Sequence, residues 1–367
     1  MKMMNAFFVF ALGISLGIGI TMIGYGFHKH IDFAAKALRL KDHGLVALDK
    51  AFGTRVRAAK LEHIVAPAPY FPPGSIWTQD ISQAPLDPQS STMINWLADA
   101  GGWGNNRMQV DFGMRVLQAD ASTPKVPFRK GHQFYSPDSD SVASVPLPRG
   151  GGFESHTGYE CPDRSDCHLI VVDRGQGKLY ETWATDYSDN VVSATFVGVW
   201  DLNRVYPPSG RGEQCTSADA AGFPIAPLLF NADELAVGHI DHAIRFILPI
   251  QRIRERVFVH PATHTAARGP VNAPPMGARF RLKSSFDMSK LTPVAQIVAR
   301  AMQKYGMFLA DNGNIALSAQ NDADTEAKYA DIDFGSRDLQ DLKVTDFEVV
   351  DGGTPIRSTN DCVRNQR

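Results

Sequence analysis

Apolar and polar residues alternate over several short stretches of the chain, a pattern typical of β-strands buried on one face. Residues 168–172 form an apolar run, residues 174–177 (Arg-Gly-Gln-Gly) provide a turn, and residues 178–183 complete a predicted hairpin. The same pattern predicts further strands at residues 191–200, 239–248, 256–260 and 279–283. Glycine, proline, asparagine and aspartate separate these segments, so the predicted fold class is mainly β, a β-sandwich or jelly-roll-like domain with a few helices.

Helical spacing of apolar residues is clearest after Thr292, which is a suitable N-cap, and it ends at Gly306. Proline at position 293 suits the first turn of that helix. Asn312-Gly313 lies between two apolar runs and predicts a hairpin at residues 307–318. Residues 136–152 are predicted to be a long loop.

The N-terminus carries an apolar run at residues 6–27, preceded by Lys2 and followed by His-Lys-His. This run fits a signal peptide or a membrane-spanning helix. Small residues suitable for cleavage first occur at residues 35–37, far beyond the run, which favours an uncleaved signal anchor. The predicted organisation is a signal peptide or signal anchor forming an N-terminal hydrophobic helix (1–30), a helical spacer (31–65), a β-rich main domain (66–350) and a tail (351–367).

The net charge and the cysteine content indicate which partners and which cellular location to expect for the protein. The formal net charge is -2, so no overall basic field exists and no nucleic acid partner is predicted. The 4 cysteines lie in polar segments of a chain with an export-like N-terminus, which predicts two disulfides, with Cys161 and Cys167 paired by proximity. Free thiols in a cytosolic protein are the alternative. The predicted location is exported, periplasmic or extracellular, with membrane attachment if the N-terminal segment is retained.

Several segments between residues 165 and 350 resemble, as an ordered set, an uncharacterised family of secreted or envelope proteins of bacteria and fungi. The segments are SADAAG (217–222), GHIDHAIRF (238–246), MGARFRLK (276–283) and YGMFLADNG (305–313). The resemblance implies a shared fold and a shared site, but no named reaction. At residues 260–264 this chain has His-Pro-Ala-Thr-His where the family has an aromatic-Pro-Ala-Arg-His form, so the arginine that would bind an anion there is missing.

The candidate catalytic residues are two glutamates and a histidine. Glu181 shares strand parity with Leu179 and Trp183, so it is predicted to point into the interior or a cleft. Glu234 lies in a predicted turn, where a capping role is the alternative. His242 shares parity with apolar neighbours, where a hydrogen-bonded core histidine is the alternative. We expect Glu181 and His242 to face a common cleft.

The candidate substrate-binding residues are Asp173, His264, Arg279, Arg281, Lys283 and Asp311. The three cations among them alternate along one strand and could bind uronate, phosphate or sulfate; the alternative is the solvated face of an edge strand. Tryptophans could provide stacking surfaces for sugars or simply pack in the core. No metal spacing such as HExxH occurs, and no metal or other cofactor is predicted.

Together these features favour an exported carbohydrate-active enzyme, a glycoside hydrolase or polysaccharide lyase, that cleaves a polysaccharide by hydrolysis or β-elimination. Its expected partner is a polysaccharide or another extracytoplasmic glycan. The alternative is a non-catalytic glycan-binding or envelope-interaction module.

Overall fold

The computed structural model describes residues 63–65, 67–162 and 166–365. The predicted signal segment (1–30) and nearly all of the predicted spacer (31–65) lie outside the described residues, so both stay predictions. Within the described part of the chain, no helix is both long enough and apolar enough to cross a membrane.

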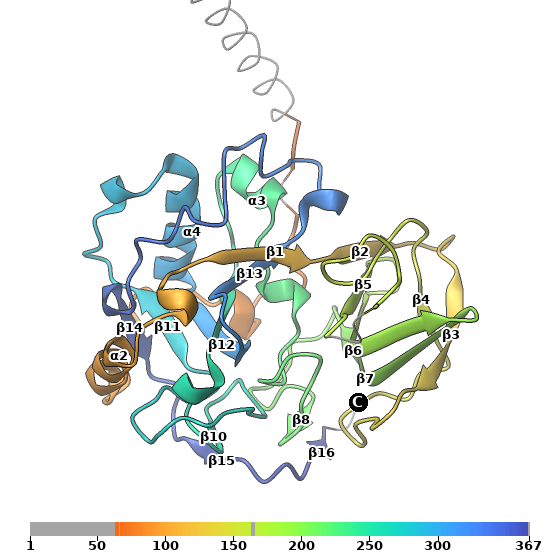
Figure 1. Cartoon of the computed structure of the whole chain (residues 1–367), viewed down its shortest axis with the longest axis horizontal. Helices are drawn as coiled ribbons and strands as arrows, with labels where there is room; N and C mark the ends of the chain where they lie inside the picture. Colours follow the sequence, from red (N-terminus) through yellow and green to blue (C-terminus); the bar gives the residue numbers. More distant parts are fainter. Residues whose placement is uncertain (1–62, 66, 163–165, 366–367) are drawn as a thin grey trace, which may run out of the picture. The chain divides into compact units, whose positions relative to one another are not determined.

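The mainly β class is confirmed, because most regular structure lies in two six-stranded sheets (Figure 1). The first sheet has the order β1 (Val110–Met114), β13 (Leu317–Gln320), β9 (Ile244–Leu248), β12 (Met307–Asn312), β11 (Arg279–Leu282) and β14 (Phe347–Val350). The second has the order β2 (Val116–Ala119), β5 (Leu169–Asp173), β6 (Lys178–Ser188), β7 (Val191–Asp201), β3 (Lys125–Lys130) and β4 (Ser144–Pro146). Two short pairs join β10 (Val257–Phe258) to β15 (Ile356–Arg357) and β8 (Gly212–Glu213) to β16 (Val363–Arg364).

Both large sheets mix parallel and antiparallel neighbours. Parallel pairs are β1 with β13, β9 with β12, β2 with β5 and β3 with β7. Strands β1 and β2 follow one another almost without interruption, and Figure 1 shows them in line, with one strand in each sheet. The two sheets are therefore connected through one nearly continuous extended segment.

Three α-helices complete the described part: α2 (Ser90–Asp99), α3 (Ala232–Val237) and α4 (Pro293–Lys304). The prediction of α4 is confirmed, since the Thr292 hydroxyl accepts a hydrogen bond from the Ala295 amide at 3.2 Å. Helices α2 and α3 were not predicted. Short 3₁₀ turns occur at Ile76–Thr78, Gly104–Asn106, Ala226–Leu228, Ile250–Arg252, Met288–Lys290, Asp322–Asp324 and Val344–Asp346.

The predicted strands and loops differ from the structure at four places. The β5–β6 hairpin is confirmed, but the hairpin predicted around Asn312-Gly313 is wrong, because β9 lies between β12 and β13. The predicted strand at residues 239–248 begins only at Ile244, and the strand predicted at 256–260 is limited to Val257–Phe258. The predicted loop at 136–152 contains the short strand β4.

Two hydrophobic cores lie on opposite faces of the second sheet. Ile170 and Val172 of β5 contact the larger core, which also includes Phe246 and Phe280 from the first sheet. Leu169 and Val171 contact a smaller core with residues of β2, β3, β4 and β7. Because both faces of β5 are covered, its sequence is a continuous apolar run rather than an alternating one.

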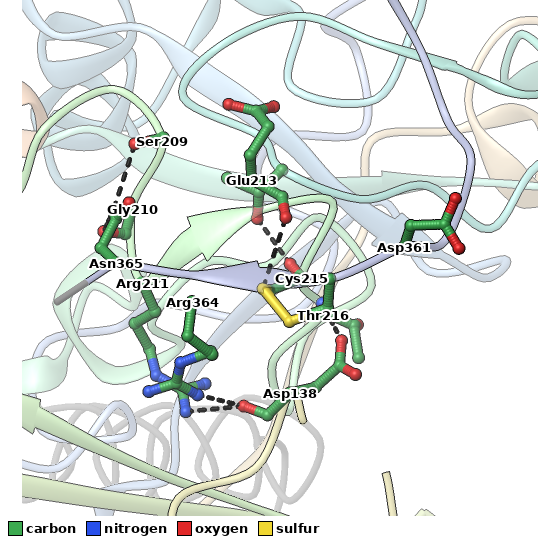
Figure 2. Close-up of a disulfide and its surroundings, with 12 residues drawn as sticks. Asp138, Ser209, Gly210, Arg211, Glu213, Cys215, Thr216, Asp361, Arg364 and Asn365 are labelled. Atoms are coloured by element: carbon green, nitrogen blue, oxygen red, sulfur yellow. Dashed lines mark hydrogen bonds between the residues drawn. A yellow bond between two sulfur atoms is a disulfide. The ribbon is translucent and has the colours of Figure 1, made fainter. Parts of the chain in front are cut away.

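Both predicted disulfides are present, Cys161–Cys167 and Cys215–Cys362, and no cysteine in the described residues is free. Such pairing is typical of proteins that mature in an oxidising, extracytoplasmic compartment. Figure 2 shows the second disulfide, which joins the C-terminal segment to the chain beyond β8. Nearby, the Arg364 guanidinium donates to the Asp138 carbonyl (Figure 2). It also donates to Asp140 Oδ1 at 2.8 Å. The C-terminal segment is thus an integral part of the fold.

Candidate functional site

A cavity of about 330 Å³ is lined by residues of both large sheets. Asp311 and Asn312 come from β12 of the first sheet, and Trp183 comes from β6 of the second. The remaining lining residues are Tyr135, Asp166, His168, Thr216, Ser217, Ala218, Asp219, Ala220, His264 and Ala266. Most of these residues are polar, unlike those of the two hydrophobic cores.

Arg245 on β9 holds two carboxylates at this cavity. Its Nε and Nη2 donate to Asp219 Oδ2 at 3.1 and 2.7 Å, and its Nη2 lies 3.8 Å from Asp311 Oδ2. Nη1 donates to the Ser318 hydroxyl at 2.8 Å. Burial raises the pKa of Asp219 to about 7, and the Arg245 charge opposes this only in part. Burial likewise raises the pKa of Asp311.

His168, immediately before β5, is bound at both ring nitrogens. Its Nδ1 lies 2.6 Å from Glu154 Oε2 and its Nε2 lies 2.9 Å from the Ala218 carbonyl oxygen. Since both neighbours are acceptors, both nitrogens donate and the ring is an imidazolium. Burial alone would lower the pKa of His168, but Glu154 outweighs burial and raises it to about 9. His168 is therefore a fixed positive charge and has no free lone pair.

The loop that carries Asp219 is closed by contacts with residues 215 and 263. The Thr263 hydroxyl donates to the Cys215 carbonyl at 2.6 Å. Gly222 has φ +82, and a Cβ there would lie 2.1 Å from Thr263 Oγ1. Only glycine fits this position, because any side chain would meet both the strained backbone angle and the threonine. The Cys215–Cys362 disulfide lies directly before the same loop.

Ala220 connects two partly exposed functional groups of the cavity, Asp311 and His264. Its amide donates to Asp311 Oδ2 at 3.4 Å, and its carbonyl accepts from His264 Nδ1 at 2.8 Å. The donating Nδ1 leaves the lone pair on Nε2, which has no hydrogen-bond partner in the described part of the chain. The Asp311 side chain is 26% exposed, whereas that of Asp219 is 0% exposed. Asp311 and His264 are thus an acid and a base that a substrate can reach, and the Asp166 carboxylate at the same cavity is exposed as well.

Two aromatic rings form one wall of the cavity. The centroids of Tyr135 and Trp183 are 5.7 Å apart with an interplanar angle of 31°. Trp183 Nε1 donates to Asp166 Oδ1 at 2.9 Å, which fixes the orientation of the indole. A tilted ring pair next to carboxylates is a surface on which a flat apolar ligand face can stack while its polar edges are hydrogen-bonded.

No protein-family model, curated protein or solved structure matches the chain. The resemblance to the uncharacterised envelope family accordingly stays a prediction. Two of the segments on which it rests, residues 217–222 and 305–313, supply Asp219 and Asp311 to the cavity.

Glu181 follows its predicted strand parity but does not reach a cleft. It is 0% exposed, with Oε1 accepting from the Ile225 and Ala226 amides at 2.8 and 3.0 Å. Oε2 accepts from Trp200 Nε1 at 3.0 Å. Burial raises the pKa of Glu181 to about 7. The carboxylate is satisfied inside the larger core, where it holds residues 225–226 against the second sheet, so the expected common open cleft with His242 is not formed.

Glu234 and His242 contact each other away from the cavity. His242 Nε2 lies 3.0 Å from Glu234 Oε1, and His242 Nδ1 lies 2.8 Å from the Ala243 carbonyl oxygen. Glu234 forms a capping box with Asn231 at the start of α3, as the capping alternative anticipated. Burial opposes protonation of His242, but Glu234 outweighs it and raises its pKa. Both side chains are buried, so this pair supports α3 rather than an open site.

Four of the predicted substrate-binding residues have other contacts. Asp173 is buried and accepts from the Gln176 amide at 2.9 Å within a turn. Arg279 is buried and donates to the Tyr305 and Gln79 carbonyls, at 2.9 Å each. Arg281 pairs with Glu348 at 2.7 Å, and Lys283 Nζ donates to the Thr345 carbonyl at 2.7 Å. Strand β11 lies between β12 and β14, so the edge-strand alternative is also wrong.

Sequence reasoning found His264 and Asp311 but missed most of their surroundings. The missed residues are Tyr135, Glu154, Asp166, His168, Asp219 and Arg245; Trp183 was anticipated only as one of several tryptophans able to stack on sugars. A signal was present for Arg245, which alternates with apolar residues in a strand covered on both faces. Of the groups able to bind a metal in the described residues, only Asp138 with Cys215 and Cys362 forms a cluster, and there the disulfide occupies both sulfurs.

Proposed function

We propose that this protein is an exported carbohydrate-active enzyme that hydrolyses glycosidic bonds of a polysaccharide in the cavity between the sheets. The observation that carries the proposal is the meeting of an accessible carboxyl of raised pKa, Asp311, with an accessible imidazole nitrogen of His264 beside the Tyr135–Trp183 wall.

In this proposal Asp311 is the general acid. Burial favours its protonated form, so it can donate a proton to the glycosidic oxygen as the bond from that oxygen to the sugar carbon breaks. His264 Nε2 accepts a proton from water while the water oxygen bonds to the same carbon. Water is thereby added across the bond. Histidine in place of the more usual second carboxylate distinguishes this site from most glycosidases.

Buried charged residues next to the cavity set the electrostatic environment of Asp311 and His264. Arg245 lies near both Asp219 and Asp311, so it limits how far the pKa of Asp311 rises. The His168 imidazolium acts on Asp311 in the same direction. Because Asp219 and His168 are fully engaged with protein partners, they set the electrostatics of the cavity without touching substrate.

Hydrolysis is favoured over β-elimination because no free cation lies among the described residues that line this cavity. Elimination next to a uronate requires a cation that neutralises the carboxylate of the reacting sugar. The described residues that line the cavity include no lysine or arginine, and His168 already donates to Glu154 and to Ala218.

A non-catalytic glycan-binding or envelope-interaction module is the second candidate. It is favoured by the same aromatic wall, because stacking on Tyr135 and Trp183 needs no acid or base.

Both candidate functions share the same location and architecture. In either case we propose that the protein is exported to the periplasm or the cell exterior, that residues 1–30 anchor it, and that its architecture is a β-sandwich or jelly-roll-like one. The disulfides and the mainly β fold support the export and architecture parts.

A screen of the full chain against pooled polysaccharides tests the proposal. Formation of new reducing ends without ultraviolet-absorbing unsaturated products is the result expected for a hydrolase. Formation of unsaturated products would instead show that the enzyme cleaves the polysaccharide by β-elimination. Retention of the protein on a polysaccharide without any cleavage would support the binding module instead.

A further inference from the structure

A second hollow, next to the candidate site, is lined by three arginines. This groove of about 780 Å³ includes Arg256, Arg268 and Arg357, all exposed. Glu255 is the acidic residue in its lining, with Oε1 3.7 Å from Arg256 Nε. The groove therefore carries a net positive charge, in a chain whose formal net charge is -2.

The fold places these arginines together from distant parts of the sequence. The β10–β15 pair brings Val257 opposite Arg357, and the Ser358 amide donates to the Arg256 carbonyl at 2.9 Å. The Arg268 amide donates to the Ile250 carbonyl at 2.9 Å. The side chains of Arg268 and Arg357 have no hydrogen-bond partner within the described residues, so their guanidinium donors are available to a ligand.

Two local features of this groove are unusual for a solvated surface. Arg256 has φ 55, a left-handed conformation that side chains other than glycine and asparagine rarely adopt. The Thr265 hydroxyl is buried and lacks a hydrogen-bond partner in the described structure. Unpaired buried polar groups are rare in native proteins, and the segment with Thr265 forms part of the groove wall.

The groove and the cavity are connected by one short segment. His264 lines the cavity, Ala266 lines both hollows, and Arg268 lines the groove. A polymer with one sugar unit at Asp311 and His264 could therefore extend its next units along this segment toward the arginines.

We propose that the arginine groove binds anionic groups of the units next to the one cleaved, so that the substrate is an acidic polysaccharide carrying carboxylates or sulfates. This rests on the function proposed above. Guanidinium groups match both anions because two parallel N–H donors fit two oxygens. The reacting unit lies among carboxylates in the cavity, and the anionic units lie among the arginines.

The test compares Arg256→Gln/Arg268→Gln/Arg357→Gln with the control Arg129→Gln/Arg300→Gln/Arg337→Gln, which removes the same charge from exposed arginines elsewhere. Both are made in the full chain, and Arg268→Gln alone provides a milder variant. Affinities for polygalacturonate, dextran sulfate and neutral dextran are measured by calorimetry at two salt concentrations. We expect the groove variant to lose about tenfold or more in affinity for one anionic polymer, with a weaker salt dependence, while dextran binding and the control are unchanged.

Loss confined to polygalacturonate identifies carboxylates as the ligand, and loss confined to dextran sulfate identifies sulfates. Equal affinities of the groove variant and the unmodified protein, or an equal loss in the control, would overturn the proposal. Tighter binding of single-stranded DNA than of either anionic polymer would also overturn it. Because these are binding measurements, they remain decisive for the groove even where the polysaccharide screen shows that the unmodified protein hydrolyses nothing.

Discussion

Asp311 and His264 are held by the two polar groups of a single residue, the amide and the carbonyl of Ala220. The two side chains come from β12 and from the loop after β10, and neither is close to residue 220 in sequence. One peptide segment thus fixes an acid and a base at the same wall of the cavity.

Asp311→Asn should lower kcat by about 10²-fold or more and leave polysaccharide affinity nearly unchanged, because an amide cannot donate the proton that the leaving oxygen needs. In the unmodified protein, activity should fall as pH rises through the raised pKa of Asp311, since the acid must be protonated. Initial rates over a range of pH check both statements. Asp341→Asn, at an exposed position, is the control, and full activity of Asp311→Asn would exclude the acid role.

His264→Asn separates the structural hydrogen bond from the base. The asparagine amide can still donate to the Ala220 carbonyl, but no nitrogen replaces Nε2. We expect kcat to fall by about 10²-fold with the fold intact, and added imidazole to restore part of it. Kinetics with and without imidazole give the answer. Absence of rescue together with a lowered melting temperature would indicate a purely structural histidine.

Trp183→Ala should raise KM for polysaccharide more than it lowers kcat, since the ring provides binding that is equal in ground and transition states. A tenfold loss of affinity corresponds to about 1.4 kcal/mol, within the range of a lost stacking surface. Trp183→Phe keeps a ring but loses the hydrogen bond to Asp166. If the phenylalanine variant binds as weakly as the alanine variant, the hydrogen bond rather than stacking carries the affinity.

The His168–Glu154 pair should make stability depend on pH. The pKa of His168 is raised in the folded state to about 9 from 6.5, so its contribution is complete below pH 6.5 and is lost as pH rises through 9. Burial also raises the pKa values of Glu181 and Asp219, but only to about 7. The change in stability that comes from titration of Glu181 and Asp219 is therefore largely complete near pH 7.5, and between pH 7.5 and pH 9.5 the change that remains is that of His168.

Between pH 7.5 and pH 9.5 the unmodified protein should lose on the order of 2 kcal/mol more unfolding free energy than His168→Gln. Urea unfolding at several pH values measures this difference. His132→Gln, at an exposed histidine, should behave as the unmodified protein does. Parallel pH profiles of the unmodified protein and His168→Gln would contradict a protonated His168.

Removal of Cys215–Cys362 should cost more stability than removal of Cys161–Cys167. The two disulfides close segments separated by 147 and 6 residues. The loop-entropy relation gives about 5 and about 2 kcal/mol respectively, if native strain is neglected. Denaturant unfolding of Cys215→Ser/Cys362→Ser and Cys161→Ser/Cys167→Ser tests the order. Alkylation of the unreduced protein, followed by mass spectrometry, should detect no free thiol in the unmodified chain.

The sequence by itself determined the local elements of this protein. The hairpin of β5 and β6 and the helix α4 depend on contacts within short segments, where turn residues, a cap and apolar spacing are all visible. The pairing of the nearest cysteines and the mainly β class followed from the same kind of information. The hairpin predicted at Asn312-Gly313 failed because an inserted strand, β9, forms the pairing that the turn residues would otherwise favour.

Only the tertiary structure decided where the accessible chemistry lies. Strand parity correctly turned Glu181 toward apolar neighbours, but parity cannot distinguish an open cleft from a closed core. His242 lies before β9, outside the strand that parity assumed, and it is enclosed as well. Arg245 lies on the opposite side of its strand, the side that a one-sided sheet would expose to solvent. Here that side is covered by the loop that carries Asp219, 26 residues away in sequence. Charges of such separate segments stabilise one another only after the chain has folded around them, so no local pattern shows which segments come together to form the site.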